Sequence, residues 1–311
     1  MKQLINVWQR FFFQPGSPRT LGVCRFCFYA TLLGIELENR PGSWAELGNS
    51  FWMPMPLFRL LGCQPPGLDL LIGLSWVWRA LLLLACVGLF TRLVTPLAFV
   101  LGVYLLGLPN NLGVVKHTET MAVFVLAILA VSRCGDALSL DQWLRGRFTR
   151  RPRVNREDLG EYTWPLRLVW VLMVLVYFAA GMAKLRNSSW RWIFSDNMQN
   201  ILIQHHYTHV PEIKLGLALA NWPWICWLAA GFSMMAELLA PLALAIRRLR
   251  LPIIGSLFLM QIGIWLLLGV QFPLYLPCYL FWVPWDRCVA WVSRTGNGIF
   301  TENWLEEPYV N

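Results

Sequence analysis

The chain has 311 residues, of which 57% are hydrophobic and only 14% are charged. Soluble domains carry about 25% charged residues, so this composition excludes an ordinary soluble protein and indicates an integral membrane protein. The 18 Trp residues agree with this, because Trp favours the membrane–water interface. A net charge of +9 would also suit a nucleic-acid partner. We attribute it instead to basic loops and expect no nucleic-acid partner.

A helix that crosses a bilayer needs about 20 mostly apolar residues. Several segments meet this condition, which predicts an all-α, polytopic bundle of about eight transmembrane helices with no large soluble domain. In chain order the predicted spans are residues 20–37, 69–90, 92–109, 118–134, 164–184, 222–246, 251–270 and 272–292. No cleavable signal peptide is visible at the start of the chain, because residues 1–20 hold no long apolar stretch.

Lys and Arg prefer the cytoplasmic side of a membrane. If the N-terminus is cytoplasmic, 17 of the 26 Lys and Arg residues lie inside, 7 lie outside and 2 lie within spans. This bias predicts that both termini are cytoplasmic, and we expect a bacterial inner (plasma) membrane as the location.

The predicted organisation has three parts: a cytoplasmic N-terminal segment at 1–19, a transmembrane domain at 20–292 and a cytoplasmic tail at 293–311. The domain contains a basic cytoplasmic loop at 135–163, which we expect to contact anionic headgroups. Outer loops are predicted at 38–68 and 185–221.

Few ionisable side chains lie within or at the ends of these spans, and each is a functional candidate because its burial in a membrane is costly. They are Arg25, Arg79, His117, Glu119, Lys184 and Glu237. Arg25 and Arg79 are expected to be structural, paired with Glu36, Glu119 or Glu237.

His117 opens the fourth predicted span and Lys184 closes the fifth, so both are expected at the outer face at similar depth. Two interpretations of Lys184 remain open. Its apolar stem can stay buried while the ammonium reaches water. Alternatively it is a desolvated amine that acts as a base near neutral pH, with a neutral His117 orienting an anionic intermediate.

Three of the four His residues cluster at 205–209. On a helix, His205 and His209 share a face, a spacing that suits a metal ion. Two nitrogens are too few for a zinc site, so we expect no metal and keep the pair as weak candidates only.

The segment from Tyr177 to Trp190, YFAAGMAKLRNSSW, resembles the signature Y-F-x-A-G-x-x-K-L…W of the vitamin K-dependent γ-carboxylase-like membrane domain. This unit is also called the horizontally transferred transmembrane (HTTM) domain. Three further segments resemble the family in order: LGVCRFCFYATLLG with Arg25, KHTETMAVFVLAILAVSRCGDALSLD with His117, and AELLAPLAL with Glu237. The resemblance covers about residues 20–290.

In the carboxylases of this family, the motif lysine deprotonates vitamin K hydroquinone. Oxygenation then yields a strong base that removes a γ-proton from a peptide glutamate, and CO2 traps the carbanion. The resemblance therefore implies Lys184 as the base and His117 as the assisting histidine, with Arg25, Glu237, Tyr177 and Trp190 in support. It implies a reduced quinone, O2 and CO2 as cofactors and co-substrates, and a small peptide or protein substrate as partner beside the lipid bilayer.

The sequence departs from the family pattern at two places. Gln261 stands where a family helix often carries His, and Arg191-Trp192 follows Trp190 where a Gly is frequent. Two alternatives to a carboxylase-like enzyme therefore stay open. One is a helper protein that matures a small secreted peptide without carboxylating it, as in compact family members required for a sporulation-delaying toxin. The other is a transporter, which the lack of internal repeats disfavours.

Overall fold

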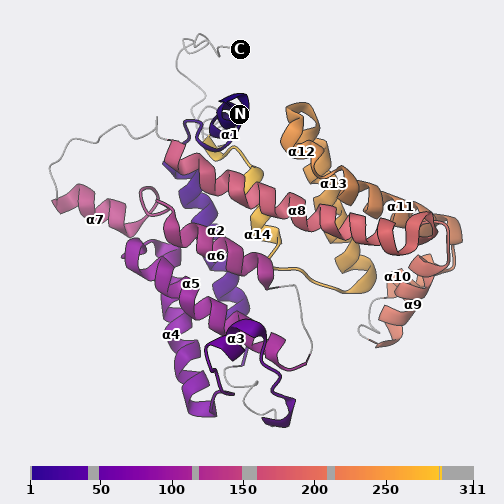
Figure 1. Cartoon of the computed structure of the whole chain (residues 1–311), viewed down its shortest axis with the longest axis horizontal. Helices are drawn as coiled ribbons and strands as arrows, with labels where there is room; N and C mark the ends of the chain where they lie inside the picture. Colours follow the sequence, from indigo (N-terminus) through magenta and orange to yellow (C-terminus); the bar gives the residue numbers. More distant parts are fainter. Residues whose placement is uncertain are drawn as a thin grey trace, which may run out of the picture.

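A computed structural model describes residues 2–40, 49–113, 119–148, 160–208, 214–286 and 288 of the chain. These residues form an all-helical structure without a strand, so the predicted all-α class is confirmed (Figure 1). The α-helices are α1 Lys2–Phe12, α2 Pro18–Glu38, α3 Pro56–Leu60, α4 Leu68–Val87, α5 Thr91–Gly107, α6 Thr120–Val131, α7 Leu140–Phe148, α8 Thr163–Ser188, α9 Asn197–Thr208, α10 Lys214–Ala220, α11 Pro223–Leu239, α12 Leu242–Ala245, α13 Arg250–Leu268 and α14 Leu276–Tyr279. Short 3₁₀ turns lie between them, at Asn49–Phe51, Leu108–Asn111, Gly160–Tyr162, Ser189–Trp192, Arg247–Leu249 and Leu280–Trp282.

Five of the helical segments in the described part are long and apolar enough to cross a bilayer, which supports an integral membrane protein. They contain α2, α4, α5, α8 and α13 and coincide with five predicted spans. Two further predicted spans form shorter apolar helices, the 12-residue α6 and the 17-residue α11. The helix α11 ends two residues after its buried charge, Glu237, and Pro241 precedes the separate α12.

The last predicted span, 272–292, is not one helix. Its described part contains only α14 and the turn Leu280–Trp282, because Pro273, Pro277 and Pro284 interrupt helical hydrogen bonding. The segment is nevertheless buried, and Cys278 and Phe281 are almost inaccessible. Irregular backbone is tolerated at membrane depth where protein surrounds it. We therefore correct this prediction from a spanning helix to a buried, broken segment.

The helices form two groups joined by α8. Helices α2, α4, α5 and α6 pack in sequence against one another, and α11 packs against α8, α9 and α13. Figure 1 shows α8 extending from the first group to the second, and α6 and α2 both contact it. The broken segment also packs on α8, because the Trp170 and Trp282 rings stack at 4.2 Å between centroids. The helix that carries the Lys184 motif is thus the central element of the fold.

Basic residues from several parts of the chain lie near the N-terminal end of α8. The guanidinium carbons of Arg167 and Arg250 lie 3.9 Å and 4.7 Å from the same Trp170 ring centroid. Arg133 forms an ion pair with Glu161, which lies in the turn just before α8. The cytoplasmic location of these basic residues stays a prediction. The predicted outer loop 185–221 holds the helical pair α9 and α10.

Candidate functional site

Lys184 lies on the face of α8 that meets α11. Residues 177, 181 and 184 are spaced i, i+4 and i+7, so they share one side of the helix. At Gly181 an added Cβ would lie 2.9 Å from the Cβ of Glu237. The glycine therefore lets α8 and α11 approach closely, as small residues do between membrane helices. This close approach brings the side chain of Lys184 to α11.

The Lys184 ammonium is held by two side chains of α11. Its Nζ lies 2.7 Å from Glu237 Oε1 and donates to Ser233 Oγ at 3.0 Å. Ser233 and Glu237 are four residues apart and so lie on the same helix face. The exposed fractions of the two charged side chains are 20% for Lys184 and 6% for Glu237. Lys184 is thus not a snorkelling lysine with its ammonium free in water; it belongs to a largely desolvated ion pair.

Glu237 retains a free acceptor. Its Oε2 is buried and has no hydrogen-bond partner within the described part of the chain. A carboxylate that pairs with an ammonium and keeps one oxygen open can accept a hydrogen bond from a ligand that reaches the site.

The indole beside Lys184 belongs to Trp192, two residues after the motif residue Trp190. Lys184 Nζ lies 5.3 Å from the Trp192 ring centroid, close enough for a cation–π contact. Trp190 is 56% exposed, and its carbonyl accepts hydrogen bonds from the backbone N–H groups of Ile193 and Phe194. Its position supports the turn after α8. The sequence-based assignment missed Trp192 and Ser233, although the i, i+4 spacing of Ser233 to Glu237 was a usable signal.

Tyr177 forms a second polar cluster on the same face of α8. Its hydroxyl lies 2.7 Å from the hydroxyl of Tyr279 and accepts a hydrogen bond of 2.8 Å from Gln261 Nε2. Tyr177 and Gln261 are both buried. Seven residues of helix separate Tyr177 from Lys184, which is about 10 Å. Gln261, the residue at which the sequence departs from the family pattern, thus binds a tyrosine of the family motif.

Arg25 and Arg79 do not form the carboxylate pairs that the sequence suggested. Arg25 is completely buried, and its two terminal nitrogens donate to the carbonyls of Cys134 and Leu138 at 2.7 Å and 2.6 Å. Arg79 Nη2 donates to the carbonyls of Glu36 and Asn39. Both arginines satisfy backbone oxygens near helix ends, a structural role that places Arg25 away from Lys184.

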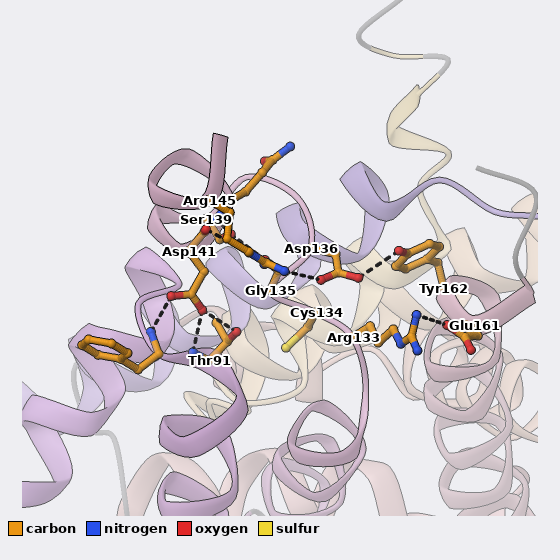
Figure 2. Close-up of polar contacts among 12 residues, drawn as sticks. Thr91, Arg133, Cys134, Gly135, Asp136, Ser139, Asp141, Arg145, Glu161 and Tyr162 are labelled. Atoms are coloured by element: carbon orange, nitrogen blue, oxygen red, sulfur yellow. Dashed lines mark hydrogen bonds and ion pairs between the residues drawn. The ribbon is translucent and has the colours of Figure 1, made fainter. Parts of the chain in front are cut away.

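The carbonyls that Arg25 binds belong to the segment 133–145, which Figure 2 shows with its polar contacts. Asp141 accepts hydrogen bonds from the backbone N–H groups of Phe90 and Thr91 and from the Thr91 hydroxyl. Partial burial acts to raise the pKa of Asp141, but these hydrogen bonds outweigh it and hold the pKa below the ordinary 3.8. Asp136 in turn accepts from Tyr162 and pairs with Arg145. Through these hydrogen bonds, the segment holds the ends of α2, α5 and α6 together.

His117 lies outside the described residues, so its expected proximity to Lys184 stays a prediction. Its neighbour Glu119 lines a cavity of about 280 Å³ between α2, α4 and α5, together with Glu36, Arg79 and Leu274. Lys184 is not among the residues that line this cavity. The cavity adjoins the Tyr177 cluster of α8 through neighbouring residues. Leu274 lines the cavity and precedes Tyr275, whose ring centroid lies 6.4 Å from that of Tyr177.

The weak metal candidates are His205 and His209. His205 lies on α9, whereas His209 lies outside the described residues. Within the described part, no three side chains of His, Cys, Asp or Glu come together as a metal site.

The fold and the site define a helical membrane protein with a buried Lys–Glu pair between two central helices. Comparison with known families gives a match to the HTTM domain over residues 13–282. Since the match covers most of the chain, the protein belongs to the HTTM family, the vitamin K-dependent carboxylase-like family. No curated protein and no solved structure matches the chain.

Proposed function

We propose that this HTTM protein is a quinol-dependent, carboxylase-like modifying enzyme in which the Lys184–Glu237 pair is the proton acceptor. The observation that carries the proposal is the pair itself: a 2.7 Å ion pair, largely removed from solvent, with Glu237 Oε2 open. A buried ion pair is weak support for stability, because desolvating both charges offsets their attraction. Its presence in the family motif is better explained by chemistry than by folding.

The residues at this site suit a reduced quinone. A quinol hydroxyl is a hydrogen-bond donor, and Glu237 Oε2 is an open acceptor for it. When bound, a quinol supplies, together with O2, the driving force for removing a γ-proton from a glutamate, to which CO2 then adds. Lys184 and Glu237 would hold the hydroxyl.

The chain's own residues have separate roles in this proposal. Lys184 and Glu237 take up one proton, and Ser233 orients the lysine amine through its 3.0 Å hydrogen bond. Trp192 covers the ammonium with its ring and limits access of water to it. His117 is proposed to assist at the substrate carbanion, as the family resemblance implies.

Quinol oxidation coupled to CO2 fixation tests the proposal. The full chain in lipid nanodiscs is supplied with vitamin K hydroquinone, O2, labelled bicarbonate and a glutamate-containing peptide. We expect a peptide mass gain of one CO2, together with quinone epoxide. Lys184→Ala is expected to lower both rates at least about 100-fold, the usual contribution of a general base. Met182→Ala is the matched control, because Met182 lies on the same turn of α8 but is 41% exposed.

Two results would contradict the proposal. If the peptide is processed or exported without gaining CO2, the helper-protein alternative replaces it. If Lys184→Ala keeps the rates of the Met182→Ala control, the pair is not the proton acceptor.

A further inference from the structure

A hollow of about 530 Å³ lies where the chain turns from α8 into α9, next to the Lys184 site. Residues of the segment 186–197 line it, including Arg186, Ser189, Arg191, Trp192 and Asn197. The lining contains two arginines and no carboxylate. Its volume falls within the range of ligand sites, about 300–1,000 Å³, and far exceeds what one bound ion needs.

The backbone holds the two arginines on the same hollow. The helix α8 ends at Ser188, and Ser189 follows with φ of +52°, a conformation that few residues other than glycine adopt. This sharp reversal leads into the 3₁₀ turn Ser189–Trp192. Arg186, in the last turn of α8, and Arg191, in the 3₁₀ turn, therefore line the same space despite lying on different elements.

The charge of the lining points to the kind of ligand. Guanidinium groups bind carboxylates with paired hydrogen bonds. Two arginines without a carboxylate among the lining residues therefore favour an anionic ligand that bears carboxylates.

The hollow and the Lys184 site share one residue. Trp192 lines the hollow, and its ring centroid lies 5.3 Å from Lys184 Nζ. The hollow is therefore adjacent to the ion pair. Arg186 and Arg191 are exposed, so the hollow is open to an approaching chain.

We propose that this hollow binds an acidic peptide segment through Arg186 and Arg191 and presents it to the Lys184–Glu237 pair. The identification of this segment as the substrate rests on the proposed function, whereas the binding site does not. A peptide is favoured over a lipid headgroup because the hollow is much larger than a phosphate group.

Peptide binding without turnover tests the site separately from the reaction. The probe is a fluorescent hexaglutamate peptide, titrated against the full chain in nanodiscs of neutral lipid without quinol, in the Lys184→Ala background. We expect saturable binding that weakens about tenfold in Arg186→Ala and about tenfold in Arg191→Ala, since each removes charge-assisted hydrogen bonds. A hexaglutamine peptide is expected to bind at least about tenfold more weakly for the same reason.

Two variants act as controls. Arg59→Ala removes an equal charge from an exposed arginine outside the hollow and leaves the affinity unchanged. Asp196→Asn removes an exposed carboxylate beside the hollow and does not weaken binding.

The outcomes separate this inference from the proposed function. Binding that depends on the two arginines supports the site even if no quinol is ever oxidised. Equal affinity in Arg186→Ala, Arg191→Ala and Arg59→Ala overturns it. It is also overturned if anionic lipid in the nanodisc displaces the peptide and the two arginine variants lose lipid binding instead, because the hollow is then a headgroup site.

Discussion

Arg25 and Lys184 are both cations within the helical bundle, but they differ in their hydrogen-bond partners and in their surroundings. Arg25 is completely buried, and two of its nitrogens are bound by backbone carbonyls of a turn. Lys184 is paired with a carboxylate that keeps one oxygen open, next to a hollow that reaches the surface. The first cation joins chain segments that are far apart in sequence. The second sits where a ligand can reach it.

Under the proposed function, the difference separates a structural charge from a functional one in a membrane bundle. A charge that fixes the fold is surrounded by acceptors which cannot move, such as the carbonyls of Cys134 and Leu138. A charge that performs chemistry is paired with another titratable group and leaves hydrogen-bonding capacity unused. Burial alone does not separate the two, because both would be rare and costly in lipid.

The largest expected effect comes from breaking the Lys184–Glu237 pair on one side only. Lys184→Met or Glu237→Leu alone leaves an uncompensated buried charge and is expected to cost about 3 kcal/mol of stability. The double variant Lys184→Met/Glu237→Leu is expected to regain most of that loss, because apolar groups often replace a buried ion pair without penalty. Denaturation of the purified variants in detergent measures all three.

Activity is the second readout of this double-mutant cycle. All three variants are expected to lose quinol oxidation, including the double variant with recovered stability. If the double variant is as unstable as the sum of the singles, the pair is not coupled and the comparison with Arg25 fails.

Removal of Arg25 is expected to have a comparable or smaller effect on stability that no second substitution rescues. Arg25→Met leaves the carbonyls of Cys134 and Leu138 without their donors. Losing hydrogen bonds from a charged donor costs about 2–3 kcal/mol here. Arg19→Ala, at an exposed position six residues earlier on α2, is expected to be neutral. Thermal denaturation followed by size-exclusion chromatography distinguishes them, and equal midpoints would contradict the structural role.

Much of this fold follows from hydrophobic segment length. The predicted spans that contain α2, α4, α5, α8 and α13 are confirmed as long apolar helices, because a run of about 20 apolar residues has few alternatives to a helix in lipid. The prediction of a spanning helix at 272–292 was wrong for a local reason. The segment is apolar enough to be buried, but its prolines prevent a continuous helix. Apolar composition predicts that a segment is buried, but a buried segment need not be helical.

The site was predictable in part. The family motif identified Lys184, and the depth of Glu237 made it a candidate. Sequence could not say that these two pair with each other, because contacts between α8 and α11 depend on packing at Gly181. The same limit explains why Arg25 was assigned a carboxylate partner. Its real acceptors are backbone carbonyls, which every residue carries and no side-chain pattern reveals.

The smallest expected effect tests the turn that Arg25 binds. Asp141→Asn replaces a carboxylate that accepts three hydrogen bonds from Phe90 and Thr91. Because Asp141 is partly exposed, the expected loss is about 1 kcal/mol.

The folded-state pKa of Asp141 is below 3.8, so the carboxylate's contribution to stability is fully present above that value and disappears as the pH falls through the folded-state pKa. The stability gap between the two proteins is therefore constant near neutral pH and closes in acid. Glu38→Gln, a carboxylate at the exposed end of α2, is the control and shows no such gap. A gap between Asp141→Asn and the parent chain that widens on acidification would show that the turn does not depend on an ionised Asp141, and would remove this carboxylate from the structural side of the comparison.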